Sequence, residues 1–154
     1  MRIRLSMKTE YGARAIYELA AAYGGEALQS AEIARRQKIP GPFLDQVLMT
    51  LRRAGLVRSV RGPRGGHLLA RSPNEIRLDE VVASLEGDGT EQSTSDRTAS
   101  ILADVTTQAD RAAQAVFAAH TLADLLRTRS AQPPVFHGIF KPLGRRPART
   151  AGRS

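Results

Sequence analysis

The sequence predicts a mostly α-helical fold that carries one small β-hairpin and ends in a long helix. Several segments have apolar residues at three- to four-residue spacing, which is typical of amphipathic helices. One of these segments, residues 41–53, is followed by two short strand-like runs, 56–61 and 66–70, joined by a Gly-Pro-Arg-Gly turn. Beyond residue 99, an aliphatic stripe runs through an alanine-rich stretch, which indicates a further helix.

The composition favours one domain with an added dimerisation segment or tail. The chain has 154 residues, of which 42% are hydrophobic and 5% aromatic, so the core is expected to be aliphatic. Cysteine is absent, which excludes disulfides, thiolate metal sites and cysteine nucleophiles. The sequence has no bilayer-spanning apolar run and no signal-peptide pattern, so we expect a cytoplasmic protein without membrane association.

The net charge of +8 is distributed unevenly along the chain. Residues 1–87 hold 14 Lys and Arg against 9 Asp and Glu, residues 88–130 hold 4 against 6, and residues 131–154 hold 5 against none. Two basic ends around an acidic middle suggest a polyanionic partner. Solubility alone is the other explanation, and charge does not separate the two.

The first two predicted helices lead into a short turn. Ser6 is a suitable N-cap for a helix over residues 7–23, in which Lys8 and Arg14 either touch a phosphate backbone or are ordinary solvated charges. Ser30 can cap a second helix over 31–38. The turn that follows is short, and Lys38 stands where many such turns carry glycine, so we expect either an unusual backbone angle there or a different turn.

The third predicted helix begins at Pro42, with Gly41 as its N-cap, and ends at Arg53, before a stop at Gly55. It is the candidate reading helix of a winged helix-turn-helix. The N-terminal half of such a helix enters the major groove of DNA. Gln46 can pair with adenine, and Asp45 can accept a hydrogen bond from the cytosine amino group. The alternative for Asp45 is that it only complements the helix dipole.

The hairpin that follows is the predicted wing. Arg61 and Arg64 flank its turn and can lie along the DNA backbone or enter a narrow minor groove, where negative potential is greatest. A generic basic hairpin is the alternative reading. A short helix over 78–86, stopped by Gly87, closes the module. The predicted DNA-contacting residues are Ser30, Pro42, Phe43, Asp45, Gln46, Met49, Arg52, Arg53, Arg61, Arg64, Gly65, Gly66 and His67.

Residues 99–130 are predicted to form one long dimerisation helix. Its aliphatic stripe is too long to be buried on a small winged module alone, and a symmetric partner helix is the simplest cover. The predicted dimerisation residues are Val105, Ala109, Ala112, Val116, Ala119, Leu122, Leu125 and Leu126.

These motifs resemble the BadM/Rrf-two family of bacterial winged-helix regulators. The resemblance is carried by LSMKTEYGARAIYELA (5–20), AEIARRQKIPGPFLDQVLMTLRRAGLVRSVRGPRGGHLLAR (31–71) and NEIRLDEVVASLEG (74–87), and more loosely by HTLADLL (120–126). It implies a homodimer that binds double-stranded DNA at a partly palindromic operator. It also implies a base contact at Asp45 and a minor-groove contact at Arg61, while Phe43 and His67 replace the usual tyrosines.

The chain departs from this family where many relatives ligate an iron–sulfur cluster with three cysteines. The matching region, residues 87–100, is short and polar and contains no cysteine, so the usual cluster cannot form and no cofactor or metal is expected. Asp88, Glu91 and Asp96 are either ligands of a hard cation or, more simply, solvated. The chain therefore resembles the cluster-free members, which sense a small molecule, a protein partner or nothing.

The resulting organisation has four parts: a DNA-binding domain (1–87), a short polar linker (88–98), the dimerisation helix (99–130) and a basic tail (131–154). The tail is rich in Pro, Gly and Arg and is predicted to be mostly disordered. It is expected to add salt-sensitive attraction to phosphates, and its apolar residues suggest docking onto the dimer or a partner.

The predicted function is a sequence-specific, homodimeric transcription regulator, most simply a repressor. The alternative is a winged-helix module that binds a protein rather than DNA, although such a wing has no need of two arginines. An enzyme is not expected, because the sequence lacks a nucleophile elbow, a phosphate-binding glycine loop with lysine, and metal-ligand spacing.

Overall fold

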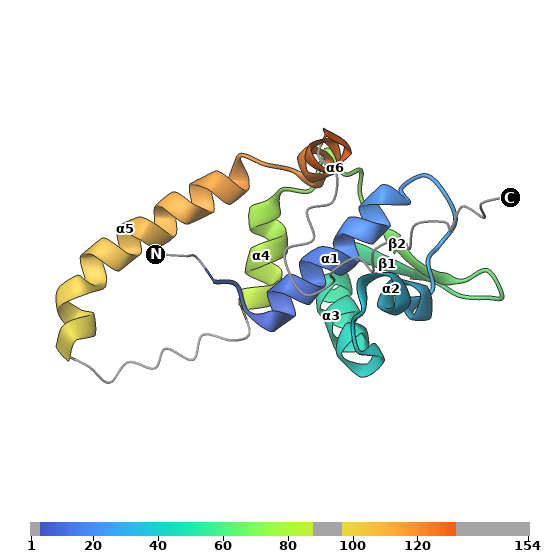
Figure 1. Cartoon of the computed structure of the whole chain (residues 1–154), viewed down its shortest axis with the longest axis horizontal. Coiled ribbons are helices and arrows are strands. Elements are labelled where there is room, and N and C mark those ends of the chain that lie inside the picture. Colours follow the sequence, from blue (N-terminus) through green and yellow to red (C-terminus); the bar gives the residue numbers. More distant parts are fainter. Residues whose placement is uncertain (1–3, 88–96, 132–154) are drawn as a thin grey trace, which may run out of the picture.

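The computed structural model describes residues 4–87 and 97–131, with side chains given over 4–87 and 102–128. In this part of the chain, helices surround one two-stranded antiparallel hairpin, as the sequence predicts (Figure 1). The elements are α1 (Met7–Ala21), α2 (Ser30–Gln37), α3 (Gly41–Arg53), β1 (Val57–Val60), β2 (Gly66–Leu69), α4 (Leu78–Glu86), α5 (Arg97–Ala118) and α6 (Leu122–Ala131).

Helix α1 is the central element, with α3, α4 and α6 packed around it (Figure 1). Ser6 is its N-cap, as predicted, and the Ser6 hydroxyl accepts a hydrogen bond from the Thr9 amide. A Cβ atom added to Gly12 would overlap the side chain of Leu85, so glycine allows α1 and α4 to cross closely. Glu86, at the end of α4, accepts hydrogen bonds from the Ser6 amide at 3.0 Å and from the hydroxyls of Ser6 and Thr9.

The helix-turn-helix consists of α2 and α3. Lys38 ends α2 in the left-handed region, with φ 53° and ψ 47°, so of the two expected alternatives the unusual backbone angle is the one observed. The helix starts are earlier than predicted. Gln29, not Ser30, is the N-cap of α2, and Pro40 is that of α3, because each helix begins one residue before the expected position.

The wing is held near its turn by the segment before α2. Strands β1 and β2 pair with Val57 opposite Leu69 and Val60 opposite Gly66. His67 also forms a bridge with Leu28: its amide donates to the Leu28 carbonyl at 2.7 Å, and the Leu28 amide donates to its carbonyl at 3.0 Å. Gly66 has φ 151°, and a Cβ atom there would overlap the Leu28 carbonyl oxygen. This close approach requires glycine.

The core beneath these elements is aliphatic, as the composition predicts. It brings together residues from every described helix except α5, and from both strands. Its largest fully buried side chains are Ile16, Leu19, Ile33, Leu44, Val47, Leu51, Leu56, Ile76, Leu85 and Leu122.

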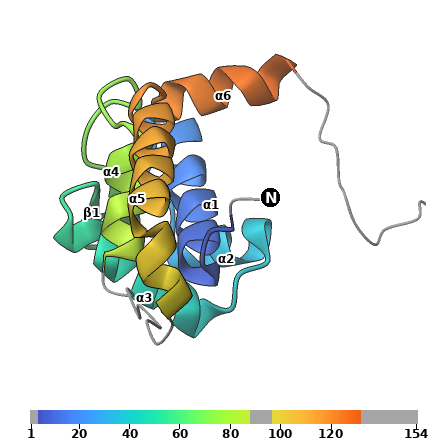
Figure 2. The ribbon, with the colours of Figure 1, turned by 90° about the vertical axis from the view of Figure 1, so that its left-hand side faces the viewer.

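The prediction of one helix over 99–130 is wrong, because α5 ends at Ala118 and α6 turns steeply away from its axis (Figure 2). The Thr121 amide donates to the Asp124 carboxylate at 2.9 Å, and the Asp124 amide donates to the Thr121 hydroxyl at 3.3 Å. These reciprocal hydrogen bonds cap the start of a new helix. The Leu78 amide donates to the His120 carbonyl, which ties the break to the start of α4.

The break also corrects the predicted dimerisation stripe. Leu122 is 1% exposed and lies in the core of its own chain, while Leu125 and Leu126 are half-buried against that core. The other five predicted residues are exposed, of which Ala119 lies in the break and the rest lie on α5, namely Val105, Ala109, Ala112 and Val116. Helix α5 contacts the rest of the chain mainly through α4, and its N-terminal part projects outward (Figure 1).

Most of the predicted linker and tail, including Asp88, Glu91 and Asp96, lies outside the described residues. Within the described ranges, no helix is long and apolar enough to cross a membrane.

Candidate nucleic-acid interface

Helix α3 separates an inner apolar face from an outer polar one. Leu44, Val47, Leu48 and Leu51 are buried, in the helical spacing that the sequence predicts. The predicted contact residues on the outer face are all exposed, namely Pro42, Asp45, Gln46, Met49, Arg52 and Arg53. The fold therefore places on one surface the side chains that the sequence assigns to base reading.

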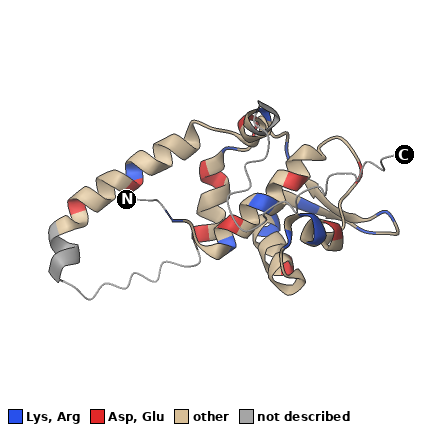
Figure 3. Ribbon diagram, in the orientation of Figure 1, with Lys and Arg blue, Asp and Glu red and all other residues tan. Residues whose placement is uncertain are grey.

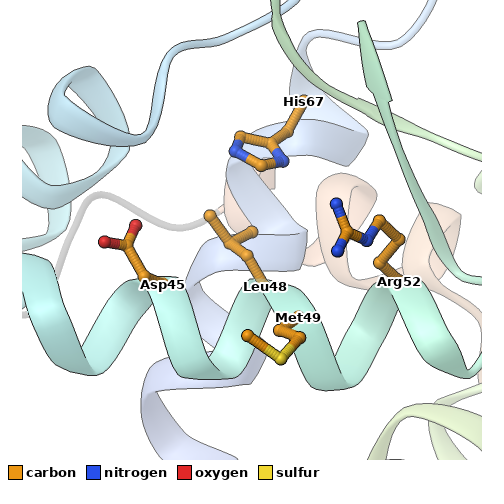
Figure 4. Close-up of a pocket in the computed structure, with 5 residues that line it drawn as sticks. All are labelled: Asp45, Leu48, Met49, Arg52 and His67. Atoms are coloured by element: carbon orange, nitrogen blue, oxygen red, sulfur yellow. The ribbon is translucent and has the colours of Figure 1, made fainter.

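Toward the wing, this surface holds a hollow of about 210 Å³, here called the wing-side pocket, which is lined by Asp45, Leu48, Met49, Arg52 and His67. Asp45 lies at the N-terminal side of the pocket and Arg52 at its C-terminal side (Figure 4). His67 reaches over Leu48 from β2. The pocket therefore joins the reading helix and the wing in one site.

The surroundings of the wing-side pocket fix the position of Arg52 and lower the pKa of His67. Arg52 Nη1 donates to the Ser59 hydroxyl at 3.3 Å, which holds α3 against β1. Burial lowers the pKa of His67, the charge of Arg52 lowers it further, and Asp45 acts in the opposite direction. His67 Nδ1 is buried and has no hydrogen-bond partner among the described residues.

On the other side of α3, a second hollow of about 350 Å³ separates this helix from the start of α1. Its lining consists of Lys8, Phe43, Gln46, Val47, Met49, Thr50 and Arg53. Lys8 and Arg53 bring two cationic side chains to one hollow, and such side chains are common phosphate contacts. Phe43 is half-buried, and its ring meets Tyr11 edge-on at a centroid distance of 5.1 Å. Phe43 therefore packs within the protein as well as being a predicted DNA contact.

The wing tip presents exposed Arg61 and Arg64 on a tight turn. The Gly65 amide donates to the Gly62 carbonyl at 2.9 Å, and a Cβ atom at Gly65 would overlap the Val60 carbonyl oxygen. Figure 3 shows Lys and Arg on α2, α3 and the wing tip, while α5 is mostly uncharged. Cationic side chains thus border the reading helix.

Not every basic residue near the turn belongs to this surface. Arg35 and Arg36 of α2 pair with Glu32 at 2.8 and 2.6 Å, and Arg36 also reaches Glu18 at 3.4 Å. Hydrogen bonds from these two arginines lower the pKa of Glu32 to about 2. Their charge is therefore largely compensated within the protein.

The structure brings most of the predicted residues to this surface and adds two. Ser30 is the exception, because it is half-buried at the first position of α2 and lines neither hollow beside α3. Leu48 is not among the predicted contact residues and is buried in the core, yet it also lines the wing-side pocket. Lys8 had two equal readings in the sequence, and only the proximity of α1 and α3 places it beside Arg53.

Comparison with known proteins identifies related regulators. The Rrf2 family, described as an iron-dependent transcriptional regulator, matches residues 5–128. The HTH-type transcriptional regulator IscR of Cereibacter sphaeroides is 44% identical over 86 residues, which cover 54% of this chain and 56% of that protein. CymR of Bacillus subtilis is 34% identical over 85 residues, covering 55% of this chain and 62% of that protein. The chain thus spans a little over half the length of these relatives.

Solved structures resemble more of the chain. The structure of T. potens IscR has a TM-score of 0.72 and 33% sequence identity, and covers 86% of this chain and 93% of that one. The structure of CymR, the global cysteine regulator of B. subtilis, has a TM-score of 0.68 and 28% identity, and covers 82% of this chain and 98% of that one.

Proposed function

Because the chain belongs to the Rrf2 family of transcriptional regulators, which are not enzymes, we propose that it binds DNA sequence-specifically as a homodimer. Its operator is partly palindromic, and its action on transcription is repression. One observation carries the proposal: the outer face of α3 exposes Asp45, Gln46 and Met49 between two hollows, and the wing contributes His67 to one of these hollows. Base-reading groups flanked by cations are what a major-groove reader requires.

The exposed apolar side of α5 supports the homodimer. Leu102, Val105 and Val116 are 49%, 61% and 60% exposed, at a spacing that puts them on one side of the helix. A second copy covers this stripe with the same residues of its own α5, so that both partners lose apolar surface to water. Two reading helices related by a two-fold axis then bind a two-fold operator.

The chain does not fit a cysteine-ligated iron–sulfur cluster, because its sequence contains no cysteine. Among the residues that the structure describes, no three His, Asp or Glu side chains are grouped as a metal site requires. We therefore propose that this regulator works without a cluster and that any effector is a small molecule or a protein.

A winged-helix module that binds only a protein is the second candidate. Its support is the bridge between His67 and Leu28, which would hold a wing equally well against a protein surface. The exposed Arg61 and Arg64 favour DNA.

The test is selection of bound duplexes by the purified full chain, followed by footprinting of the best one and by the variant Arg61→Ala. We expect a two-fold protected site, and about tenfold weaker binding of that site by Arg61→Ala because the minor-groove contact is lost. Arg58→Ala is the matched control, since Arg58 is an exposed arginine on β1 away from the wing tip. Binding that is equally tight to all sequences would contradict the proposal, and equal losses in both variants would reject the role of Arg61.

A further inference from the structure

The wing-side pocket has an apolar centre between two opposite charges. Leu48 and Met49 occupy the middle, with the Asp45 carboxylate toward one end and the Arg52 guanidinium toward the other (Figure 4). Leu48 is 2% exposed and forms part of the core, whereas Met49 is 41% exposed. A ligand that enters the pocket therefore meets an acceptor at one rim, donors at the other and a thioether side chain between them.

The edges of the base pairs differ in whether they carry an apolar group that could pack against Leu48 and Met49. In the major groove every base presents donors or acceptors, and thymine alone among the unmodified bases adds an apolar group, its 5-methyl. A polar edge pressed on Leu48 and Met49 would lose hydrogen bonds to water without replacement. A methyl group loses none and gains from burial.

We propose that the wing-side pocket binds the 5-methyl group of one thymine in each operator half-site, with Met49 as the specificity-determining contact. The inference rests on the proposed function and names a base that the reading helix selects. The thymine O4 atom, an acceptor, lies toward Arg52, whose guanidinium has donors beyond the one given to Ser59. The Asp45 carboxylate repels O4 and so faces a neighbouring base that presents an amino group.

The size of the effect follows from burying one methyl group. Replacing this thymine by deoxyuridine removes the methyl and leaves the base pair and O4 unchanged. We expect about fourfold weaker binding for one half-site and about 15-fold for both, from the transfer free energy of a single carbon group.

The experiment uses the full chain and the duplex obtained by selection. Each thymine is replaced in turn by deoxyuridine, and dissociation constants are measured for the wild type, Met49→Gln and Met49→Leu. We expect the thymine preference at one symmetric position to disappear in Met49→Gln, because the polar side chain gains nothing from contact with a methyl group. The preference should persist in the apolar control Met49→Leu. In a parallel measurement, 5-iodouracil at that position should photocross-link to Met49 or His67.

Distinct outcomes separate this inference from the proposed function. If binding is sequence-specific but no deoxyuridine replacement weakens it, the thymine-methyl proposal is wrong, while the proposed function as a DNA-binding regulator is retained. The same conclusion follows if Met49→Gln keeps the preference for thymine. A gain from 5-methylcytosine at a site where deoxyuridine has no effect also overturns thymine as the occupant. Failure to select any duplex over random DNA overturns both.

Discussion

At the scale of single residues, Asp45 has the clearest position. It is exposed and lies in the second turn of α3, whose first turn carries no acidic residue. The helix-dipole effect fades beyond the first turn, so this position weighs against capping as its role. A carboxylate facing DNA costs affinity through phosphate repulsion, so we expect Asp45 to contribute selectivity rather than affinity.

Asp45→Ala is therefore expected to relax the preference for one base pair by about 1–3 kcal/mol, with overall affinity unchanged or higher. Competition between the selected duplex and single-base variants measures this change. Asp45→Asn, which keeps the size but can also donate, should shift the preference rather than remove it. A uniform loss across all sequences, accompanied by a lower melting temperature, would instead indicate a structural role.

His67 makes a second residue-scale prediction, because burial and Arg52 lower its pKa in the folded chain. Between the unfolded value near 6.5 and the lower folded value, the unfolded chain binds a proton that the folded chain does not. The free energy of unfolding should therefore have its full value above about pH 6.5. It should decrease as the pH falls through the interval between the unfolded and folded pKa values of His67. Urea unfolding at several pH values measures it.

His67→Gln should flatten the pH dependence of the free energy of unfolding between the two pKa values of His67. Four carboxylates also have a lowered pKa in the folded chain, namely Glu32, Glu80, Glu86 and Asp124. Their contribution to the free energy of unfolding is lost only below their ordinary pKa, which is a more acidic range than that of His67. An unchanged slope in His67→Gln would show that another group titrates there.

At the scale of elements, the wing depends on the approach of Gly66 to Leu28. Gly66→Ala combines an unfavourable φ of 151° with an overlap on the Leu28 carbonyl, and should destabilise the fold by about 1–3 kcal/mol. Gly41→Ala is the matched control, because a Cβ atom there meets nothing within 4 Å and φ is not positive. Thermal unfolding of both variants tests the difference; equal melting temperatures would contradict it.

The elements that the sequence predicts well are those with local signals. Ser6, the Gly55 stop after α3 and the Gly-rich wing turn each act within a few residues, so α1, α3 and the hairpin lie close to their predicted bounds. The break between α5 and α6 also has a local signal, the pair Thr121 and Asp124, but the continuous aliphatic pattern across it suggested one helix. The bridge from Leu28 to His67 joins distant segments, and no local pattern indicates it.

At the scale of the whole molecule, assembly is the principal prediction. A charge in the exposed stripe of α5 should oppose pairing, since it would be buried against apolar side chains of the second copy. We expect Val116→Glu to sediment as a monomer and to bind the two-fold site about 10²-fold more weakly, because the second half-site is no longer tethered.

Gln114→Glu is the matched control, with the same charge on the exposed opposite side of α5. It should remain dimeric. If Val116→Glu also remains dimeric, the stripe on α5 is not the interface.

The bridge between Leu28 and His67 also affects how the wing moves. Backbone amides held in such a bridge exchange slowly with solvent, so protection should extend to His67 while the exposed Arg61, Gly62 and Arg64 of the turn exchange fast. A loop whose base is fixed has less conformational entropy to lose when its arginines are immobilised on a ligand. The wing is thus partly preorganised before binding, and cutting the bridge should raise the entropic cost of association even where every arginine is retained.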